Sequence, residues 1–278
     1  MYKRQYLPWS ITGEWLVKQP HEGANTHRHR ISVVRQFTLF LFRQGYRADV
    51  PNALLGARKE AEFCPRILTR AEVGKLLQAV DRLTPTARSP LRHIIMPEVF
   101  RLLCGCGFRL GEVLHLRLAD VDLQQGILTV RNGKFGKDRL VPPAPTLVLR
   151  LRNYAEHFGA RPPEAFFFPS PHGGPLSLRT VYFLFRKLLL QCGIPHAGRG
   201  KGPRVHDLRH GFAVHTLLRW YQEGADLEAK LPLLATYLGH RSVAGTQHYL
   251  HLTAELFPEI TVRTNAAFGD VTPRRIAP

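Results

Sequence analysis

The chain has 278 residues, of which 44% are hydrophobic, and its 39 lysines and arginines stand against 21 aspartates and glutamates. This apolar content excludes a disordered chain, and no apolar run reaches the roughly 20 residues that a membrane-spanning helix requires. The formal net charge of +18 indicates a polyanionic partner, with nucleic acid as the first candidate, although charge alone also fits a ribosome-associated or generically basic protein.

The opening residues and the cysteines predict the compartment. The first ten residues, MYKRQYLPWS, contain no apolar signal core. The four cysteines form neither a CxxC pair nor a small disulfide framework, and such spacing suits a reducing compartment; they are Cys64, Cys104, Cys106 and Cys192. We therefore expect no membrane attachment and a cytoplasmic, nucleoid-associated protein.

Residues 25–44 are predicted to form an amphipathic helix that ends at Gly45. The apolar side chains recur at helical spacing, and the basic ones are crowded toward the start of the helix. The apolar set is Ile31, Val34, Phe37 and Leu41, and the basic set is His27, Arg28, His29, Arg30 and Arg35. The basic end is either a solvated face or, if DNA is the partner, a phosphate contact.

A linker and a new helix start predict two domains. Pro51 and Gly56 interrupt any pattern between residues 46 and 64. Thr69 and Glu72 then form a capping box ahead of an apolar helical run. We expect a small N-terminal helical domain over residues 1–60 and a larger domain over 65–278.

The next segment predicts two helices that meet at a tight junction. Residues 97–103 form a buried helix in this prediction, and residues 110–116 form another that begins just past Gly107. Arg109 lies at this junction, where its side chain can project into a cleft. Taken alone, a buried arginine at a helix start is more often structural than catalytic.

Strands follow, and then helix again. Residues 127–131 and 139–141 read as a β-hairpin with a glycine-rich basic tip, and Phe166–Phe168 reads as a short third strand. Residues 177–190 return to helix, with Arg179, Arg186 and Lys187 on its polar side, and residues 195–204 form a basic loop. The predicted fold is mainly α (α+β), with a small antiparallel sheet in the larger domain.

Two short basic clusters and one tyrosine stand at fixed spacing near the end of the chain: His206–His210, Leu238–His240 and Tyr249. A phosphodiester is best held by guanidinium forks and imidazole donors, which His206, Arg209 and His240 supply. A phenol beside them could attack the phosphorus, because these donors would stabilise the phenolate and the transition state. This pattern points to a covalent protein-DNA enzyme.

Two other interpretations of these residues remain open. His206 and His210 are four apart, which on a helix can bind zinc, but Arg209 lies between them and no third ligand follows at a recognised spacing. We therefore expect no metal and no other cofactor. Tyr249 alone would be a packed core tyrosine in most helices, and His210 is interpreted as a structural or phosphate-side histidine.

In their order and spacing, these motifs resemble the tyrosine recombinases, or phage-type integrases, which include the Xer proteins. The resemblance covers roughly residues 65–255. It implies the catalytic set Arg109, Lys134, His206, Arg209, His240 and Tyr249. Lys134 and Lys137 both lie in the hairpin, and the family's glycine-lysine pattern after the first strand favours Lys134. Glu112, one turn beyond Arg109, is expected to orient it.

The resemblance also implies a mechanism and partners. Tyr249 would form a 3′-phosphotyrosyl link, Lys134 would protonate the departing 5′-oxygen, and His206 would assist proton transfer or phosphate binding. The residues after the nucleophile, 253–278, would dock on a neighbouring protomer. The implied assembly is a homotetramer on two sites in double-stranded DNA, with room for accessory DNA-bending proteins.

The sequence therefore predicts a site-specific DNA recombinase or integrase with a DNA-binding N-terminal domain and a catalytic C-terminal domain. Two alternatives are kept: a type IB topoisomerase-like enzyme, which shares the chemistry, and a catalytically silent DNA-binding protein that retains the fold.

Overall fold

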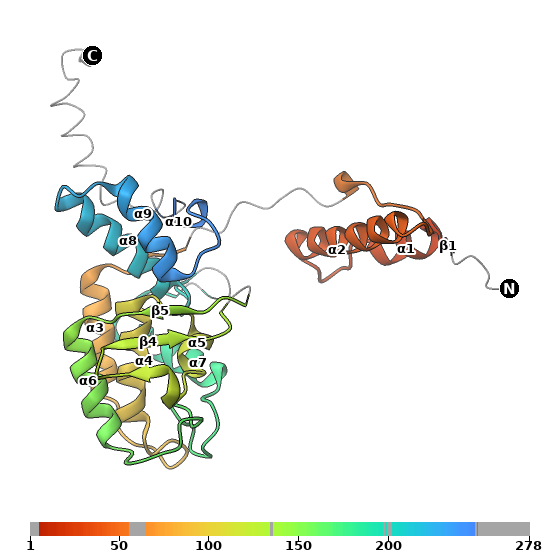
Figure 1. Ribbon diagram of the computed structural model, residues 1–278. Coiled ribbons are helices and arrows are strands. Elements are labelled where there is room, and N and C mark those ends of the chain that lie inside the picture. The colour runs from red at the N-terminus through yellow and green to blue at the C-terminus, as the bar shows by residue number, and fades with distance from the viewer. Residues whose placement is uncertain are drawn as a thin grey trace, which may run out of the picture. The chain divides into compact units, whose positions relative to one another are not determined.

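The computed structural model divides the chain into two units, Met1–Cys64 and Pro65–Pro278, and describes residues 6–55, 65–133, 136–196, 198, 202–247 and 249. Both units are mostly helical, and the larger one also carries a small sheet (Figure 1). The predicted fold class is therefore confirmed. Within these residues, no helix has the length and apolar character needed to cross a membrane.

The smaller unit is built on one long helix. Its elements are β1 (Tyr6–Leu7), α1 (Trp9–Leu16), α2 (Ala24–Arg43), β2 (Arg47–Ala48) and the 3-10 turn η1 (Ala53–Leu55). α2 confirms the helix predicted over residues 25–44, and Gly45 follows it with a φ of 82°, a left-handed conformation that glycine adopts readily. β1 and β2 pair in parallel, so the linker predicted from residue 46 is wrong as far as residue 55. Residues 56–64 lie outside the described residues.

The basic start of α2 is partly used for internal contacts. His27 is buried, and its Nε2 lies 2.7 Å from the last carbonyl oxygen of α1. Arg30 donates from Nε to a glutamate in the preceding loop at 3.0 Å, and Arg35 donates to a carbonyl in the loop after β2. These three side chains make contacts within the unit. They therefore do not form the solvated or phosphate-binding face that was predicted for them. Arg28 and His29 are exposed.

The apolar face predicted for α2 is only partly buried. Ile31 is buried and Val34 and Leu41 are half-buried, as expected. Phe37, predicted to lie on the same face, is 53% exposed. The prediction is wrong at Phe37 because helical spacing alone does not show how wide a stripe α1 and the adjoining loops can cover.

The larger unit holds the remaining elements. Its helices are α3 (Arg70–Asp81), α4 (Arg92–Cys106), α5 (Leu110–Leu114), α6 (Pro145–Glu156), α7 (Leu178–Gln191), α8 (Asp207–Gln222), α9 (Leu227–Leu238) and α10 (Ala244–Gln247), with a 3-10 turn η2 (Leu118–Asp120). The capping box is confirmed: the amide of Glu72 donates to Thr69 Oγ1 at 3.1 Å, and the amide of Thr69 donates to Glu72 Oε2 at 2.9 Å. α7 confirms the helix predicted over 177–190, with its three basic residues exposed.

The junction between α4 and α5 is as tight as predicted, although the bounds of both helices differ from the prediction. α4 begins at Arg92, five residues before the predicted start, and carries Pro97 inside it. It ends at Gly107, whose φ of 63° turns the chain directly into α5, and a Cβ there would lie 2.5 Å from a ring carbon of Phe212. α5 ends two residues earlier than predicted.

The sheet of the larger unit has the order β3-β4-β5, made of β3 (Val121–Asp122), β4 (Ile127–Val130) and β5 (Arg139–Val141). β4 and β5 form the predicted hairpin, with Val130 opposite Arg139. The third strand predicted at Phe166–Phe168 is wrong, since β3 takes that place. Two of these phenylalanines are buried in the core, and the segment pairs with the loop after α5 only through an isolated bridge.

Two buried clusters lie in the larger unit. The main core surrounds α4, which packs against α3, α6 and α8. A smaller cluster lies between α8 and α9 and includes Tyr249. α8, α9 and α10 lie together at one end of the unit, next to the hairpin of β4 and β5 (Figure 1). This arrangement brings the two basic clusters and the tyrosine close to Arg109. Residues 197 and 199–201 of the predicted basic loop lie outside the described residues.

Candidate active site

Arg109 is placed by the left-handed turn at Gly107, which lets α5 begin directly after α4. Arg109 is the N-cap residue of α5, and Glu112 lies one turn along. The Arg109 amide donates to Glu112 Oε2 at 2.8 Å, and its Nη1 donates to Glu112 Oε1 at 2.7 Å. Glu112 therefore orients Arg109 from both its backbone and its side chain, as predicted. The Arg109 side chain is 23% exposed.

Arg209 lies in the first turn of α8 and is 1% exposed. Its Nη1 donates to the carbonyl of Gly107 at 2.7 Å, and its Nη2 donates to the carbonyl of Leu238. Burial, followed by the positive charge of Arg109, lowers the pKa of Arg209 to about 10. The guanidinium is still charged at neutral pH, and it joins three segments: α8, the α4–α5 junction and the end of α9.

The carboxylate of Glu112 also binds a second arginine, which comes from the sheet. Arg139, at the start of β5, donates from Nη1 and Nη2 to Glu112 Oε1 and Oε2 at 2.9 and 2.7 Å. Burial opposes ionisation of Glu112, but hydrogen bonds from Arg139 and from the amide of Arg109 outweigh it and lower its pKa to about 2. Glu112 is thus an anion shared by two guanidinium groups.

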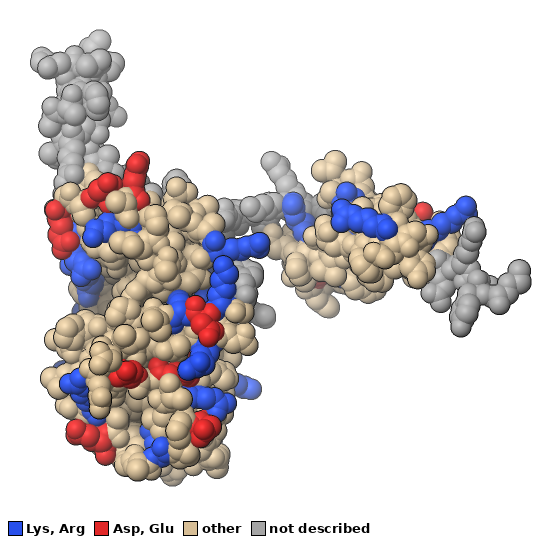
Figure 2. Space-filling model, viewed as in Figure 1, with Lys and Arg blue, Asp and Glu red and all other residues tan. Residues whose placement is uncertain are grey.

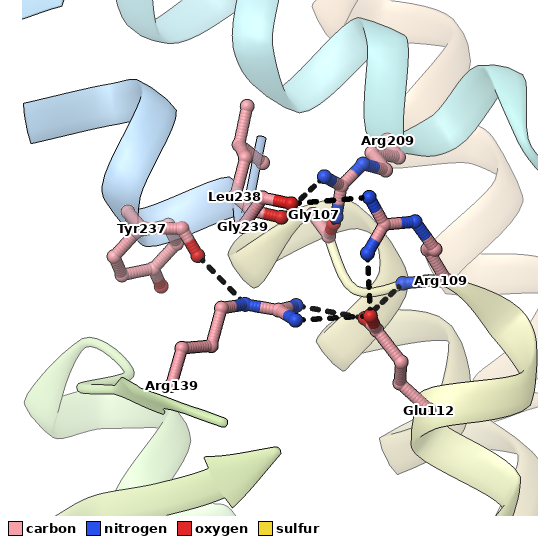
Figure 3. Close-up of polar contacts among 8 residues, drawn as sticks. All are labelled: Gly107, Arg109, Glu112, Arg139, Arg209, Tyr237, Leu238 and Gly239. Atoms are coloured by element: carbon pink, nitrogen blue, oxygen red, sulfur yellow. Dashed lines mark hydrogen bonds and ion pairs between the residues drawn. The ribbon is translucent and has the colours of Figure 1, made fainter. Parts of the chain in front are cut away.

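Three successive carbonyls at the end of α9 each accept a hydrogen bond from a different arginine (Figure 3). The carbonyl of Tyr237 accepts from Arg139 Nε at 3.0 Å, that of Leu238 accepts from Arg209, and that of Gly239 accepts from Arg109 Nη2 at 3.4 Å. A helix C-terminus carries partial negative charge, so these cations also stabilise it. The arginines therefore fix the turn that leads to His240.

His240 follows Gly239, whose left-handed φ of 69° ends α9. Its Nδ1 lies 2.7 Å from Oγ1 of Thr246, a residue of α10 that is fully buried. Burial, followed by the charge of Arg209, lowers the pKa of His240 to about 4, so the imidazole is neutral at pH 7. The contact with Thr246 holds the ring in one orientation.

Tyr249 is 3% exposed and belongs to the cluster between α8 and α9. Its hydroxyl lies 3.2 Å from Nδ1 of His210, and its ring centroid lies 5.9 Å from that of His240. Burial raises the pKa of Tyr249, while the charge of Arg209, a hydrogen bond from Arg209 and the charge of Arg109 lower it. The two arginines therefore favour the phenolate, as expected, but burial outweighs them and the phenol keeps its proton.

His206 is the residue just before α8 and is exposed. Its ring packs edge-on against that of His210, with centroids 4.8 Å apart. Although part of the residue is exposed, partial desolvation of the ring, followed by the charge of Arg209, lowers the pKa of His206. Lys134 lies outside the described residues. Lys137, the alternative lysine of the hairpin, is exposed, and its carbonyl accepts a hydrogen bond from Gly133.

The structure therefore brings five of the six predicted residues to one end of the larger unit: Arg109, His206, Arg209, His240 and Tyr249. Among the described residues, no group of three or more histidine, cysteine, aspartate or glutamate side chains is placed to hold a metal ion. Guanidinium and imidazole groups around a phenol form a site suited to a phosphodiester anion.

Three further residues belong to this site: His210, interpreted from the sequence as a structural or phosphate-side histidine, and Thr246 and Arg139, which were not predicted in it. His210 contacts the phenol, Thr246 holds His240, and Arg139 holds Glu112. The alternation of side chains along β5 could have predicted the buried position of Arg139. Arg139 lies two residues before the buried Val141, and Leu140 between them is 62% exposed. Alternation therefore puts Arg139 on the buried face of the sheet, where a charged side chain requires a partner.

The surface around the site is basic. Lysine and arginine side chains gather along the edge of the larger unit where the β4–β5 hairpin projects, with a few acidic ones among them (Figure 2). Further basic side chains lie on the surface of the smaller unit (Figure 2). Such a distribution favours the approach of a polyanion.

Comparison with known proteins identifies the family. Residues 66–255 match the phage integrase family. The integrase/recombinase y4rB of Sinorhizobium fredii is 36% identical over 248 residues, which cover 87% of this chain and 79% of that protein. The tyrosine recombinase XerC of Chromobacterium violaceum is 36% identical over 223 residues, or 80% of this chain and 68% of that protein. The crystal structure of XerA recombinase is 26% identical, covers 99% of this chain and 86% of that one, and superposes with a TM-score of 0.56. The chain belongs to the phage integrase family and is a tyrosine recombinase, an enzyme that cleaves and rejoins DNA.

Proposed function

We propose that this recombinase cleaves DNA by attack of Tyr249 on a phosphodiester held by Arg109, Arg209 and His240. The observation that carries the proposal is the position of the Tyr249 hydroxyl, 3.2 Å from His210 and within the field of the Arg209 and Arg109 guanidinium groups, which lower its pKa. A phenol buried beside cationic donors and a neutral imidazole has both an electrostatic site for the phosphate and a proton acceptor next to it.

The transesterification forms the bond between Tyr249 Oη and phosphorus and breaks the bond between phosphorus and the 5′-oxygen. Because the pKa of Tyr249 is raised, the phenol must lose its proton during the attack, and Nδ1 of His210, 3.2 Å from the hydroxyl, is placed to accept it. Lys134 donates a proton to the departing 5′-oxygen, and His206, exposed beside His210, assists proton transfer or phosphate binding. The products are a 3′-phosphotyrosyl link and a 5′-hydroxyl.

The covalent link conserves the energy of the broken phosphodiester. A 5′-hydroxyl from a second duplex can therefore attack it, which reverses the step and joins the strands in a new order. Strand exchange between two DNA sites follows from this reversibility, so we propose site-specific recombination or integration as the biological reaction.

The smaller unit, Met1–Cys64, which corresponds to the domain predicted over residues 1–60, is proposed to bind double-stranded DNA. The exposed Arg28 and His29 are the groups at the start of α2 that remain for phosphates, since His27, Arg30 and Arg35 make internal contacts. Cytoplasmic, nucleoid-associated localisation and accessory DNA-bending proteins stay predictions.

The proposed assembly is a homotetramer on two DNA sites, held in part by the tail of each protomer. The tail over residues 253–278 lies outside the described residues and contains the apolar residues Leu256, Phe257, Ile260, Val262 and Phe268. A cavity of about 580 Å³ lies among α3, α4, α8 and α9, and its lining includes Val73, Phe212, Trp220 and Leu233. We propose that this cavity receives the tail of a neighbouring protomer, because the apolar side chains of the tail match the mostly apolar lining of the cavity.

A nicked suicide substrate tests the proposal. DNA flanking the gene, nicked so that the cleaved fragment diffuses away, should trap the enzyme as a covalent adduct. Tyr249→Phe should form no adduct and still bind DNA, whereas Tyr182→Phe, which changes a tyrosine on the surface of α7, should behave like the wild type. Adduct formation by Tyr249→Phe at the wild-type rate would refute the assignment.

The two alternatives are separated by paired assays. A type IB topoisomerase-like enzyme would relax supercoiled plasmid without a pair of sites. A silent DNA-binding protein would neither relax the plasmid nor recombine two sites. Recombination between two sites on one plasmid, with little relaxation of a plasmid that has none, is the expected result.

A further inference from the structure

Arg139 has no role in the reaction proposed above, although it is among the most constrained side chains near the site. Each of its three guanidinium nitrogens donates a hydrogen bond within the protein: two to the carboxylate of Glu112 and one to the carbonyl of Tyr237. Its side chain is 8% exposed, compared with 23% for Arg109. Arg139 is therefore placed to act on other protein groups, while Arg109 is the more accessible cation.

The register of the sheet explains why an arginine points inward here. Val130 of β4 lies opposite Arg139, and both Val130 and Val141 are buried on the same face. A guanidinium on a buried face must be paired to be tolerated. Glu112 supplies this pairing with both carboxylate oxygens, in the bidentate geometry that arginine provides and lysine lacks.

Arg139 joins three parts of the site that are distant in sequence. It starts from β5, it reaches α5 through Glu112, and it reaches the end of α9 through the carbonyl of Tyr237 (Figure 3). Its side chain also lies against the turn itself, because a Cβ added to Gly239 would be 3.0 Å from Arg139 Cδ. The position of His240, the next residue, thus depends on this packing.

The charges add a second argument. Arg109 and Glu112 alone form a neutral ion pair, in which the carboxylate competes with a phosphate for the guanidinium. With Arg139 on the same carboxylate, the three side chains carry a net charge of +1, and the hold of Glu112 on Arg109 is shared with a second cation. Arg139 thereby leaves Arg109 more attractive to an anion.

We propose that Arg139 is a positioning residue for phosphodiester cleavage, which holds Glu112 and the turn at residues 237–239 so that Arg109 and His240 meet the same phosphate with a net positive charge. This inference rests on the proposed function, because it assigns Arg139 an effect on a phosphate held by Arg109 and His240.

The test compares adduct formation by Arg139→Gln and Arg139→Lys in the full-length protein. Two suicide substrates are used: an ordinary one, and one with a methylphosphonate at the scissile position, which lacks the negative charge that Arg109 must meet. On the ordinary substrate we expect Arg139→Gln to react roughly 10²-fold more slowly than the wild type and Arg139→Lys to fall between them. On the methylphosphonate the gap between Arg139→Gln and wild type should shrink to within about threefold, because little anionic charge is left to stabilise.

Arg150→Gln is the matched control. Arg150 pairs with the buried Glu98 at 2.6 Å, so its loss also removes a guanidinium from a buried carboxylate, but this pair joins α6 to α4, away from the site residues. Arg150→Gln should lower the unfolding midpoint in urea about as much as Arg139→Gln does, and it should leave the cleavage rate of the folded protein unchanged on both substrates.

Several results would overturn the inference. Wild-type activity of Arg139→Gln would do so, as would an equal loss on both substrates matched by Arg150→Gln, which would indicate a purely structural effect. A fall of about one in the salt slope of DNA binding would make Arg139 a phosphate ligand itself. If Arg139→Gln does not fold, Arg139→Lys decides alone. If the wild type forms no adduct, the proposed function fails, and the inference fails with it. If the wild type forms the adduct and both Arg139 variants form it at the same rate, the inference alone fails.

Discussion

Nδ1 of His210 lies 3.2 Å from the hydroxyl oxygen of Tyr249. Burial raises the pKa of the phenol, and burial together with the charge of His206 lowers the pKa of His210 to about 4. At neutral pH the phenol is therefore protonated and the imidazole is neutral, so the hydroxyl can donate to Nδ1 when the ring proton is on Nε2. In the proposed reaction, His210 would therefore both orient Tyr249 and accept its proton.

We expect His210→Ala to lower the rate of adduct formation by roughly 10²-fold, the lower end of the range for loss of a general base. The affinity for DNA should not change, because the ring faces the phenol. His157→Ala, which removes an exposed histidine of α6, serves as the control. Single-turnover kinetics on the suicide substrate measure the rate, and a wild-type rate for His210→Ala would leave His210 with a packing role only.

The hairpin lysines can be distinguished with a modified substrate. A sulfur in place of the 5′-bridging oxygen gives a leaving group that needs no proton. Lys134→Ala should be slower than wild type by 10² or more on ordinary DNA and close to wild type on the sulfur-substituted DNA. Lys137→Ala should react at the wild-type rate on both. Rescue of Lys137→Ala, with Lys134→Ala unaffected, would move the general acid to Lys137.

The histidines of the site predict a loss of stability in mild acid. His210 and His240 have pKa values of about 4 in the folded protein, below the ordinary value of 6.5, so the unfolded chain binds more protons between these two pH values. The free energy of unfolding therefore falls as the pH drops from 6.5 toward 4, by at most about 1.4 kcal/mol per pH unit for each group. Glu112, with a pKa of about 2 against 4.5, adds a further loss below pH 4.5.

Urea unfolding at a series of pH values measures this dependence. His240→Asn, which cannot titrate, should reduce the slope between pH 6.5 and 4 to the contribution of His210 and leave the slope below pH 4 unchanged. An equal slope for wild type and variant over that first window would show that His240 is not the group responsible.

The cavity among α3, α4, α8 and α9 predicts a surface variant that affects assembly alone. Leu233 lines the cavity and is 61% exposed, so Leu233→Asp should fold normally. A carboxylate there would have to be desolvated when an apolar tail docks, which is unfavourable. We expect adduct formation on a single site to persist and the tetramer on two sites to be lost in native gels and in light scattering. Leu190→Asp, at an 82% exposed position of α7, is the control.

Local signals in the sequence predicted much of the fold. The capping box at Thr69, the turn at Gly107 and the β4–β5 hairpin all depend on residues close in sequence, and all were found. The third strand predicted at Phe166–Phe168 did not form: Phe167 and Phe168 are buried in the core, and the segment pairs only through an isolated bridge at Phe166. Phe37 was placed in the core by its spacing, although nothing in the sequence showed how much of α2 would be covered.

The type and order of residues in the sequence predicted which residues form the site. The contacts among these residues could not be predicted in the same way. His210 and Tyr249 are 39 residues apart, and Arg139 and Tyr237 are 98 apart, so only the packing of α8, β5 and α9 brings them together. The raised pKa of Tyr249 likewise reflects burial between α8 and α9, which a list of neighbouring cations does not reveal. The roles of Arg109, Lys134, His206, Arg209, His240 and Tyr249 remain predictions for the experiments above.

Arg139, Arg209 and Arg109 bind main-chain carbonyls at the end of α9, and this limits which mutations α9 can accept. Side chains at positions 237 and 238 can be exchanged with little effect on those hydrogen bonds, because every residue offers the same carbonyl. Adding or deleting one residue within α9 would instead rotate the carbonyls by about 100° around the helix axis, away from Arg139, Arg209 and Arg109. The length of this helix is thus fixed more strictly than the composition of its exposed face, and a library of variants in α9 should tolerate substitutions at exposed positions and reject single-residue insertions.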